Sequence, residues 1–231
     1  MRILGLIGGL SWESTVPYYS LINQSIKQQL GGLHSARLIL YSLDFHDVER
    51  LMRTDDWDGA GALLAGAARS LEAAGAQALV LCTNTLHKVA GTIEAAVSIP
   101  LLHIIDATAE EIVRAGFSTV GLLGTRFTME QPFYSERLEL HGLKVLTPDR
   151  GERDLLHRMI FEELCLGQLL QHSREHCQGI MRSLVAHGAQ AIILGCTELS
   201  ALIGAADAAV TLFDTTGIHA RKAAQWALAQ D

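Results

Sequence analysis

Short, continuous apolar runs alternate along the chain with longer segments whose apolar residues recur at helical spacing. The runs 78–82 and 191–194 are almost free of polar residues, which is typical of buried strands in a parallel sheet. Each follows a segment with one apolar helical face that ends at a glycine, Gly75 or Gly188. Strands that alternate with helices predict parallel pairing and a sheet covered on both faces.

The expected elements follow the same plan in the two halves of the chain. A strand runs into glycine and a helix follows, and later a second helix leads into a buried strand. In the first half we expect strands at 2–7, 37–42 and 78–82 and helices near 15–29 and at 60–74. In the second half we expect strands at 119–123 and 191–194 and helices near 131–141 and at 174–187.

The second half also repeats the sequence of the first. Gly-Ala-Gln-Ala-Leu-Val-Leu at 75–81 recurs with two isoleucines at 188–194, an offset of 113. Three further matches have offsets of 116 (Gly5–Gly8), 115 (Pro17–Tyr19) and 108 (Ile105–Thr108). Four matches in the same order predict a duplication, and two unrelated α/β halves with similar strands are the alternative. We expect one domain at 1–104 plus about 217–231 and a second at 105–216.

Composition and charge narrow the class of protein. With 231 residues, 49% hydrophobic and 19% charged, the chain buries a real core, which excludes disorder. The 18 basic residues form no run and the net charge is −7, which argues against nucleic acid as a partner. No apolar stretch approaches the roughly 18 residues of a membrane span. Four scattered cysteines without a C-x-x-C pair indicate reduced thiols in a cytoplasmic protein.

Candidate chemistry follows the strands, because ligands of open parallel sheets bind beyond their carboxyl ends. The first turn is not the G-x-G-x-x-G of a dinucleotide site, and no Walker A lysine follows it. The offset of 113 sets Thr83 opposite Cys196, so a hydroxyl and a thiol would face each other across a cleft. That pair suits chemistry with one group on each face of a carbon, such as moving a proton between faces. The residues after the strands are Gly8, Gly9, Leu10, Ser11, Thr83, Asn84, Thr85, Gly124, Thr125, Cys196, Thr197 and Glu198.

Over essentially its full length the chain resembles the aspartate/glutamate racemase family. The resemblance rests on Gly8-Gly9, on Ser-Trp-Glu-Ser-Thr at 11–15, on Asn84-Thr85, on Phe-Glu-Glu-Leu at 161–164 and on Gly-Cys-Thr-Glu at 195–198. It is strongest to the enterobacterial branch of L-aspartate/glutamate-specific or broad-specificity amino-acid racemases. The resemblance implies two similar α/β halves with the site in the cleft between them, and usually a homodimer. It also implies a C-terminal helix, from about Gly217, that packs back on the first half.

The resemblance further implies proton transfer without pyridoxal phosphate, so we expect no organic cofactor and no metal. Typical members have a cysteine at each catalytic position, whereas this chain has Thr83 at the first, as does the branch that it resembles. Cys82 lies opposite Gly195 and should point away from the cleft, because side chains alternate along a strand. We expect Thr83 and Cys196 to be the catalytic pair, with local donors lowering the thiol pKa. The alternatives are a hydrogen-bonding wall for Thr83 and a buried structural cysteine for Cys196.

The other candidate residues are expected to bind the substrate. Asn84, Thr85 and Thr197 would hold its α-carboxylate, with ordinary turn and cap residues as the alternative. Glu198 would hold the α-ammonium group or orient the thiol, or it is a first-turn acid stabilised by the helix dipole. By analogy with the family, the first loop of the cleft holds Leu10 and Ser11.

Several further titratable residues are interpreted as structural. His87 is expected at a helix surface or cap rather than in a proton shuttle. His172 and His176 have the i,i+4 spacing of metal ligands but no third ligand, which favours a solvated helix face. Two cysteines are expected in the core and two arginines on the surface, with contact to a substrate carboxylate as the arginines' alternative: Cys165, Cys177, Arg50 and Arg53.

The expected function is therefore interconversion of L and D amino acids, with glutamate or aspartate as the substrate. A broad-specificity racemase and a related isomerase or decarboxylase are alternatives within the enzymes. An amino-acid-binding protein with little turnover is the alternative outside them, because Thr83 replaces a thiol. Exchange of the substrate α-proton in deuterated water separates an enzyme from a binder.

Overall fold

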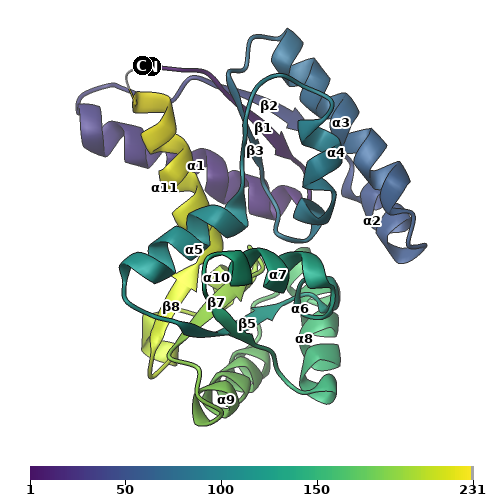
Figure 1. Ribbon diagram of the computed structural model, residues 1–231, viewed down its shortest axis with the longest axis vertical. Coiled ribbons are helices and arrows are strands. Elements are labelled where there is room, and N and C mark those ends of the chain that lie inside the picture. Colours follow the sequence, from purple (N-terminus) through teal and green to yellow (C-terminus); the bar gives the residue numbers. More distant parts are fainter. Residues whose placement is uncertain (230–231) are drawn as a thin grey trace. The chain divides into compact units, whose positions relative to one another are not determined.

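The computed structural model describes residues 1–229, which form two compact units (Figure 1). The first unit contains Met1–His103 together with residues 219–229, and the second contains Ile104–Ile218. Each unit holds one four-stranded sheet in which every pairing is parallel. The predicted fold class, two similar α/β halves with mainly parallel sheets, is confirmed. The predicted division into domains stays a prediction, because compactness alone does not show that a unit folds by itself.

The sheet of the first unit has the strand order β2-β1-β3-β4. Its strands are β1 (Leu4–Gly8), β2 (Leu38–Ser42), β3 (Ala78–Leu81) and β4 (Leu101–Leu102). Its helices are α1 (Trp12–Leu30), α2 (Phe45–Arg53), α3 (Trp57–Ala73), the 3₁₀ helix η1 (Thr85–Val89), α4 (Ala90–Glu94) and most of α11 (Thr215–Leu228).

The sheet of the second unit has the corresponding order, β6-β5-β7-β8. Its strands are β5 (Thr119–Gly124), β6 (Lys144–Leu146), β7 (Ala191–Gly195) and β8 (Thr211–Asp214). Its helices are α5 (Ile104–Arg114), α6 (Arg126–Glu130), α7 (Pro132–Leu140), α8 (Arg150–Glu162), η2 (Leu164–Leu166), α9 (Gln171–Ala186), α10 (Leu199–Leu202) and η3 (Ala205–Asp207).

The two faces of the first sheet are covered by different helices, as Figure 1 shows. Leu4 and Leu6 of β1 lie in one buried cluster with Tyr18 of α1 and Ala223 of α11. Alternate residues point the other way, and a β-carbon added at Gly5 would lie 3.1 Å from the β-carbon of Leu71 at the end of α3. The C-terminal helix α11 therefore packs on the first unit, as the family resemblance implied.

The register of the central strand pair is the same in both units. Leu81 pairs with the residue before the last glycine of β1, and Leu194 pairs with the residue before the last glycine of β5. Thr83 lies two residues beyond Leu81, and Cys196 lies two residues beyond Leu194. Thr83 and Cys196 therefore occupy equivalent places in the two sheets, in agreement with the repeat of 113 residues.

One of the repeat matches is wrong. The sequence match sets Asp106 opposite Asp214, but Asp106 lies inside α5 and Asp214 ends β8. In the sheets, β4 pairs with β3 through Leu101 as β8 pairs with β7 through Leu212. This register makes Asp214 the counterpart of His103, because sheet pairing rather than local similarity fixes which residues are equivalent.

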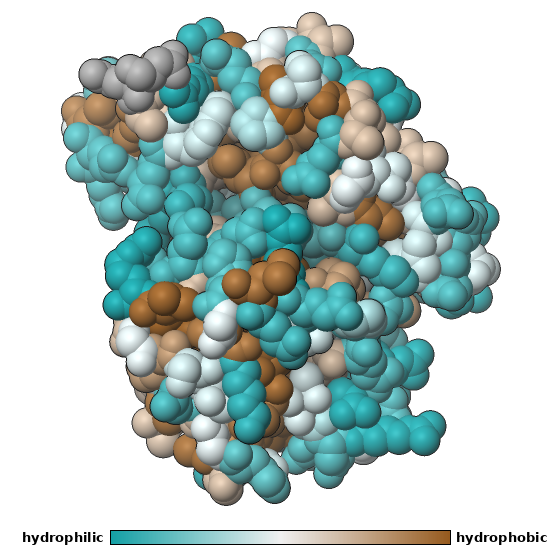
Figure 2. Space-filling view, in the orientation of Figure 1, coloured by the Kyte–Doolittle hydropathy of each residue, from teal (hydrophilic) through white to brown (hydrophobic). Residues whose placement is uncertain are grey.

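The described surface is mostly hydrophilic on the face that is drawn in Figure 2. On the face drawn in Figure 2, hydrophilic residues predominate and hydrophobic ones gather only in separate patches. Within residues 1–229, no helix combines the length and the apolar character that crossing a membrane requires.

Candidate functional site

In the first unit, two loops leave neighbouring strands at the same edge of the sheet. Leu10 and Ser11 follow β1, and Thr83 follows its neighbour β3. Gly9 has a φ of +78°, and a β-carbon there would overlap the carbonyl oxygen of Leu43. Only glycine fits this close approach. The register thus brings the loop at 9–11 and the turn at 83–85 to one edge, as the sequence predicted.

The loop after β1 is fixed by side-chain hydroxyls. Ser11 is the N-cap of α1 and its Oγ accepts a hydrogen bond from the backbone N–H of Ser14. Thr125 does the same for α6 in the second unit, where it accepts from the N–H of Thr128. Leu10, which a cis peptide bond joins to Ser11, is buried. The two loops are therefore built alike, and the Ser11 hydroxyl has a structural task besides any contact with substrate.

The turn after β3 presents an uncommitted hydroxyl. Thr83, Asn84 and Thr85 are 8%, 3% and 6% exposed. Among the residues that the structure describes, no hydrogen-bond partner is found for the Thr83 hydroxyl. Its backbone is held at both ends, since its N–H donates to Leu81 and its carbonyl oxygen lies 2.8 Å from Nδ1 of His87.

Cys82 does not belong to this polar turn. Its side chain is fully buried in the cluster that also contains Tyr18 and Ala220. Burial raises the pKa of the Cys82 thiol far above its ordinary value. Cys82 thus packs in the apolar core of the first unit, and its orientation away from the cleft stays a prediction.

In the second unit, the Glu198 carboxylate accepts hydrogen bonds from the polar groups that follow β7. Oε2 of Glu198 accepts hydrogen bonds from the Cys196 thiol at 2.9 Å and from the Thr197 hydroxyl at 2.6 Å. Glu198 precedes α10 but makes no side-chain capping bond to it. The geometry therefore favours a carboxylate that orients the thiol over a carboxylate that serves the helix dipole.

The expectation about the Cys196 pKa was wrong. Burial raises the pKa of this thiol well above its ordinary value, and the negative charge and hydrogen bonding of Glu198 raise it further. The sequence argument assumed donors around the sulfur, which would favour a thiolate. The structure provides a carboxylate acceptor, whose effect on the pKa outweighs that of the one backbone hydrogen bond from Glu198 that lowers it.

Two residues near these groups were expected to have only structural roles elsewhere. Cys165, expected in the core, is only partly buried, and its Sγ lies 3.6 Å from Oε1 of Glu198. His87, expected at a surface or a cap, is 3% exposed and binds the Thr83 carbonyl. The i,i+4 spacing of His87 from Thr83 was a usable signal, whereas nothing in the sequence links Cys165 to Glu198.

The other expectations for titratable residues agree with the structure. Cys177 is buried, and burial raises its pKa to about 12. His172 and His176 are both exposed on α9, and Arg50 and Arg53 are exposed on α2. Among residues 1–229 there is no group of three or more His, Cys, Asp or Glu side chains suited to a metal ion.

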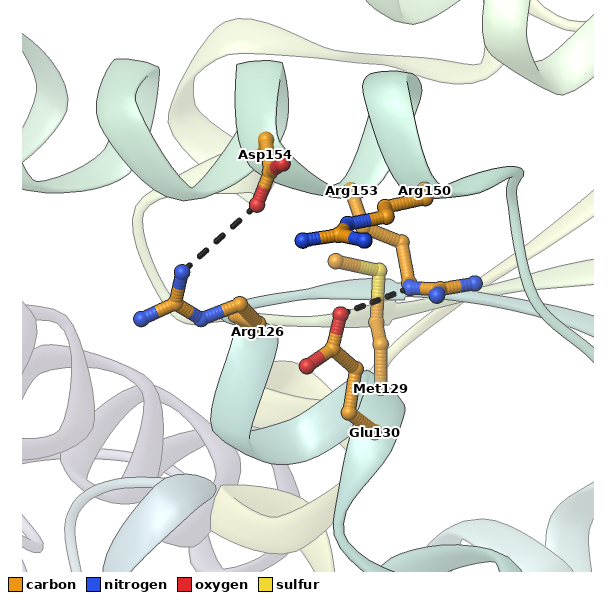
Figure 3. Close-up of a pocket in the computed structure, with 6 residues that line it drawn as sticks. All are labelled: Arg126, Met129, Glu130, Arg150, Arg153 and Asp154. Carbon is orange, nitrogen blue, oxygen red and sulfur yellow. Dashed lines mark hydrogen bonds and ion pairs between the residues drawn. The ribbon is translucent and has the colours of Figure 1, made fainter.

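A separate pocket of about 630 Å³ lies between α6 and α8 of the second unit (Figure 3). Its lining contains three arginines and no lysine, and two of the arginines form ion pairs with carboxylates. Nη1 of Arg126 lies 3.6 Å from Oδ1 of Asp154, and Nε of Arg153 lies 2.9 Å from Oε1 of Glu130. None of the predicted site residues lines this pocket, so it is not part of the candidate site.

Comparisons with known proteins agree with the geometry. The family model for Asp/Glu/hydantoin racemases matches residues 7–223. The broad-specificity amino-acid racemase RacX of Bacillus subtilis (strain 168) is 24% identical over 224 residues, 95% of each protein.

Two solved structures are similar over nearly the whole chain. A presumed Asp/Glu racemase from Yersinia pestis is 57% identical, with a TM-score of 0.92 and coverage of 99% of this chain and 100% of that one. PH1733, an aspartate racemase homologue from Pyrococcus horikoshii OT3, is 37% identical, with a TM-score of 0.86 and the same coverage. From the family model, these relatives and the matching sheets, the chain belongs to the Asp/Glu/hydantoin racemase family.

Proposed function

We propose that this racemase interconverts the L and D enantiomers of glutamate or aspartate, with Cys196 and Thr83 acting on opposite faces of the α-carbon. The observation that carries the proposal is the equivalence of these two residues in the register of their sheets. A thiol and a hydroxyl at equivalent places give each face of the α-carbon one protic group.

The proposed reaction begins with the protonated thiol. Cys196 loses its proton to water, and Oε2 of Glu198, 2.9 Å away, holds the sulfur in place. The thiolate then removes the α-proton of the L-enantiomer. The carbanion takes a proton from the Thr83 hydroxyl on the other face, which yields the D-enantiomer. Water then gives a proton to the Thr83 alkoxide and takes one from Cys196, so that no proton is gained or lost over the cycle.

The remaining predicted residues would bind the amino acid. Asn84, Thr85 and Thr197 offer hydroxyl, amide and backbone N–H donors for its α-carboxylate, and all lie at the carboxyl ends of strands. Leu10 and Ser11 would form the neighbouring wall, since their loop leaves the adjacent strand at the same edge. These assignments require neither a metal nor an organic cofactor.

The substrate proposal has a second candidate. The two solved relatives are named for aspartate or glutamate, which supports an acidic amino acid. RacX is named for broad specificity, which supports a wider range of amino acids. We place acidic substrates first because the relatives named for them share more sequence identity with this chain.

We also propose that the protein is a cytoplasmic homodimer. Its four cysteines are all free, as expected in a reducing compartment. Trp12, Val16 and Tyr19 follow one another at helical spacing on α1 and are 65%, 56% and 58% exposed. An exposed apolar stripe of this kind is typical of a surface that binds a partner, here a second copy of the chain.

The test of the activity is chiral chromatography of each L-amino acid after incubation with the enzyme. Wild type should form the D-enantiomer from glutamate or aspartate, and Cys196→Ser should lose at least about 100-fold in rate, since serine is a much poorer base. Cys177→Ala is the matched control, because it removes a buried thiol of the same unit and should leave the rate within about threefold. Binding without turnover in wild type would favour the binding-protein alternative, and equal rates on many amino acids would favour broad specificity.

A further inference from the structure

Three histidines lie together in the interior of the first unit. His87, His103 and His219 are 3%, 7% and 0% exposed. The ring centroid of His87 lies 4.5 Å from that of His103 and 6.0 Å from that of His219. Most buried polar side chains are hydrogen-bonded, so we expect each of these buried rings to have a hydrogen-bond partner.

The hydrogen bonds of His219 give this residue a structural role. Its Nε2 lies 2.6 Å from the carbonyl oxygen of Leu102, which only accepts, so Nε2 carries the proton. Burial lowers the His219 pKa to about 4, so the ring is neutral and its Nδ1 accepts from the Tyr18 hydroxyl at 2.8 Å. These bonds tie α11 to β4 and α1, far along the chain from the turn at 83–85.

His87 has a different partner, the backbone of the proposed catalytic residue. The N–H of His87 donates to Asn84, which begins the helical turn there and leaves the Thr83 carbonyl outside it. Nδ1 of His87 lies 2.8 Å from that carbonyl oxygen, and a carbonyl only accepts, so Nδ1 donates. The imidazole thus satisfies a buried acceptor that the helix does not reach.

We propose that His87 is a positioning residue for Thr83. Its bond fixes the peptide plane between Thr83 and Asn84, and with it the directions of the Thr83 hydroxyl and of the Asn84 N–H. No hydrogen-bond partner for the hydroxyl is found among the described residues, so its direction depends on the backbone, which restricts the χ1 rotamer of a β-branched side chain. This inference rests on the proposed function, because it gives the bond a role only if Thr83 delivers a proton.

The consequence is specific to one face of the substrate. Without the hydrogen bond from His87, Cys196 still removes the α-proton of the L-enantiomer and returns a proton to the same face. Delivery of a proton from Thr83 to the other face is impaired. Solvent deuterium then enters the L-enantiomer without inversion. A general loss of structure would lower exchange and racemisation together, so the ratio of the two rates distinguishes positioning from stability.

The experiment compares variants in deuterated water with L-glutamate and L-aspartate. His87→Leu removes the donor and should lower racemisation at least about tenfold while α-proton exchange in the L-enantiomer persists. His87→Asn should restore racemisation to within about threefold, because its amide nitrogen is also bonded to Cγ, as Nδ1 is. Where His87→Leu does not fold, His87→Gln replaces it, since its amide nitrogen lies one bond further out.

Tyr18→Phe is the matched control. It removes one hydroxyl from the same buried cluster without touching Thr83, so the ratio of exchange to racemisation should equal that of wild type. A wild-type ratio in His87→Leu or His87→Gln, or a failure of His87→Asn to restore racemisation, would overturn the positioning role. If the wild-type enzyme neither exchanges the α-proton of these substrates nor racemises them, the proposed function itself is rejected. That result comes from the wild type alone and is therefore distinct from a failure of the His87 proposal.

Discussion

The thiol sulfur of Cys196 lies 2.9 Å from Oε2 of Glu198, close enough for the thiol to donate a hydrogen bond to the carboxylate. Burial and this negative charge both raise the pKa of the thiol. The proposed base is thus stored in its protonated form, with its proton in a hydrogen bond to the carboxylate. Because of this raised pKa, only a small fraction of Cys196 is thiolate at neutral pH.

This relationship predicts a pH dependence. Below its raised pKa, the thiolate fraction of Cys196 grows about tenfold per pH unit, so kcat/KM from the L-enantiomer should rise as the pH rises. Glu198→Gln removes the charge that raises this pKa, so its rising limb should move to lower pH. The measurement is a pH–rate profile of both proteins. Identical limbs would mean that Glu198 does not control the thiol.

Thr83→Cys should restore a thiol to the second face. A hydroxyl loses its proton at a much higher pKa than a thiol, so removal of the D-enantiomer's α-proton is the slower half of the proposed reaction. We expect kcat from the D-enantiomer to rise at least about tenfold, which corresponds to about 1.4 kcal/mol. Because the equilibrium constant of racemisation is one, kcat/KM must remain equal in the two directions. Initial rates at saturating D-substrate test this, and an unchanged or lower kcat would count against a base at position 83.

The stripe on α1 predicts the oligomeric state. Wild type should have twice the mass of one chain in multi-angle light scattering. Val16→Glu places a charge between Trp12 and Tyr19 and should yield the single-chain mass without unfolding the helix, because Val16 is 56% exposed. Leu140→Glu is a control at another exposed apolar residue, 86% exposed on α7. A monomeric wild type, or a dimeric Val16→Glu, would exclude this face as the interface.

His219 predicts a loss of stability in acid. Its pKa is about 4 in the folded chain and about 6.5 when unfolded, so the unfolded chain binds a proton first as the pH falls. Its contribution to the free energy of unfolding is present above pH 6.5 and should fall by up to about 1.4 kcal/mol per pH unit towards pH 4. Urea titrations at several pH values should show a shallower fall for His219→Gln than for His187→Gln, an exposed control on α9's C-cap. Equal slopes would mean that His219 is not the group that titrates.

Much of the architecture was predictable, because apolar runs and glycine stops are local signals. The expected strands and helices begin and end within three residues of the observed ones. The short strands β4, β6 and β8 were not predicted, since two to four residues carry too little pattern. The match of Asp106 with Asp214 failed because similar tetrapeptides occur at different places relative to the strand.

The positions of the candidate residues relative to the strands were predictable, whereas their electrostatics were not. Position after a strand identified Cys196 and Thr83, and the repeat paired them. The direction of the Cys196 pKa shift depends on which groups surround the sulfur. Cys165 contacts Glu198 across a sequence separation of 33, which no local pattern reveals. The burial of His87 also depends on tertiary packing, because a polar residue in a short helix is usually expected at the surface.

The most direct test of the central claim follows the α-proton in deuterated water. With L-glutamate or L-aspartate and wild-type enzyme, the account predicts that the D-enantiomer formed early carries deuterium at the α-carbon, because Thr83 supplies a solvent-derived proton. The L-enantiomer that remains should keep its protium at that stage, since the proton removed on the Cys196 face is not the one delivered. Early D-product that retains the original protium would show transfer by a single group and would contradict the account.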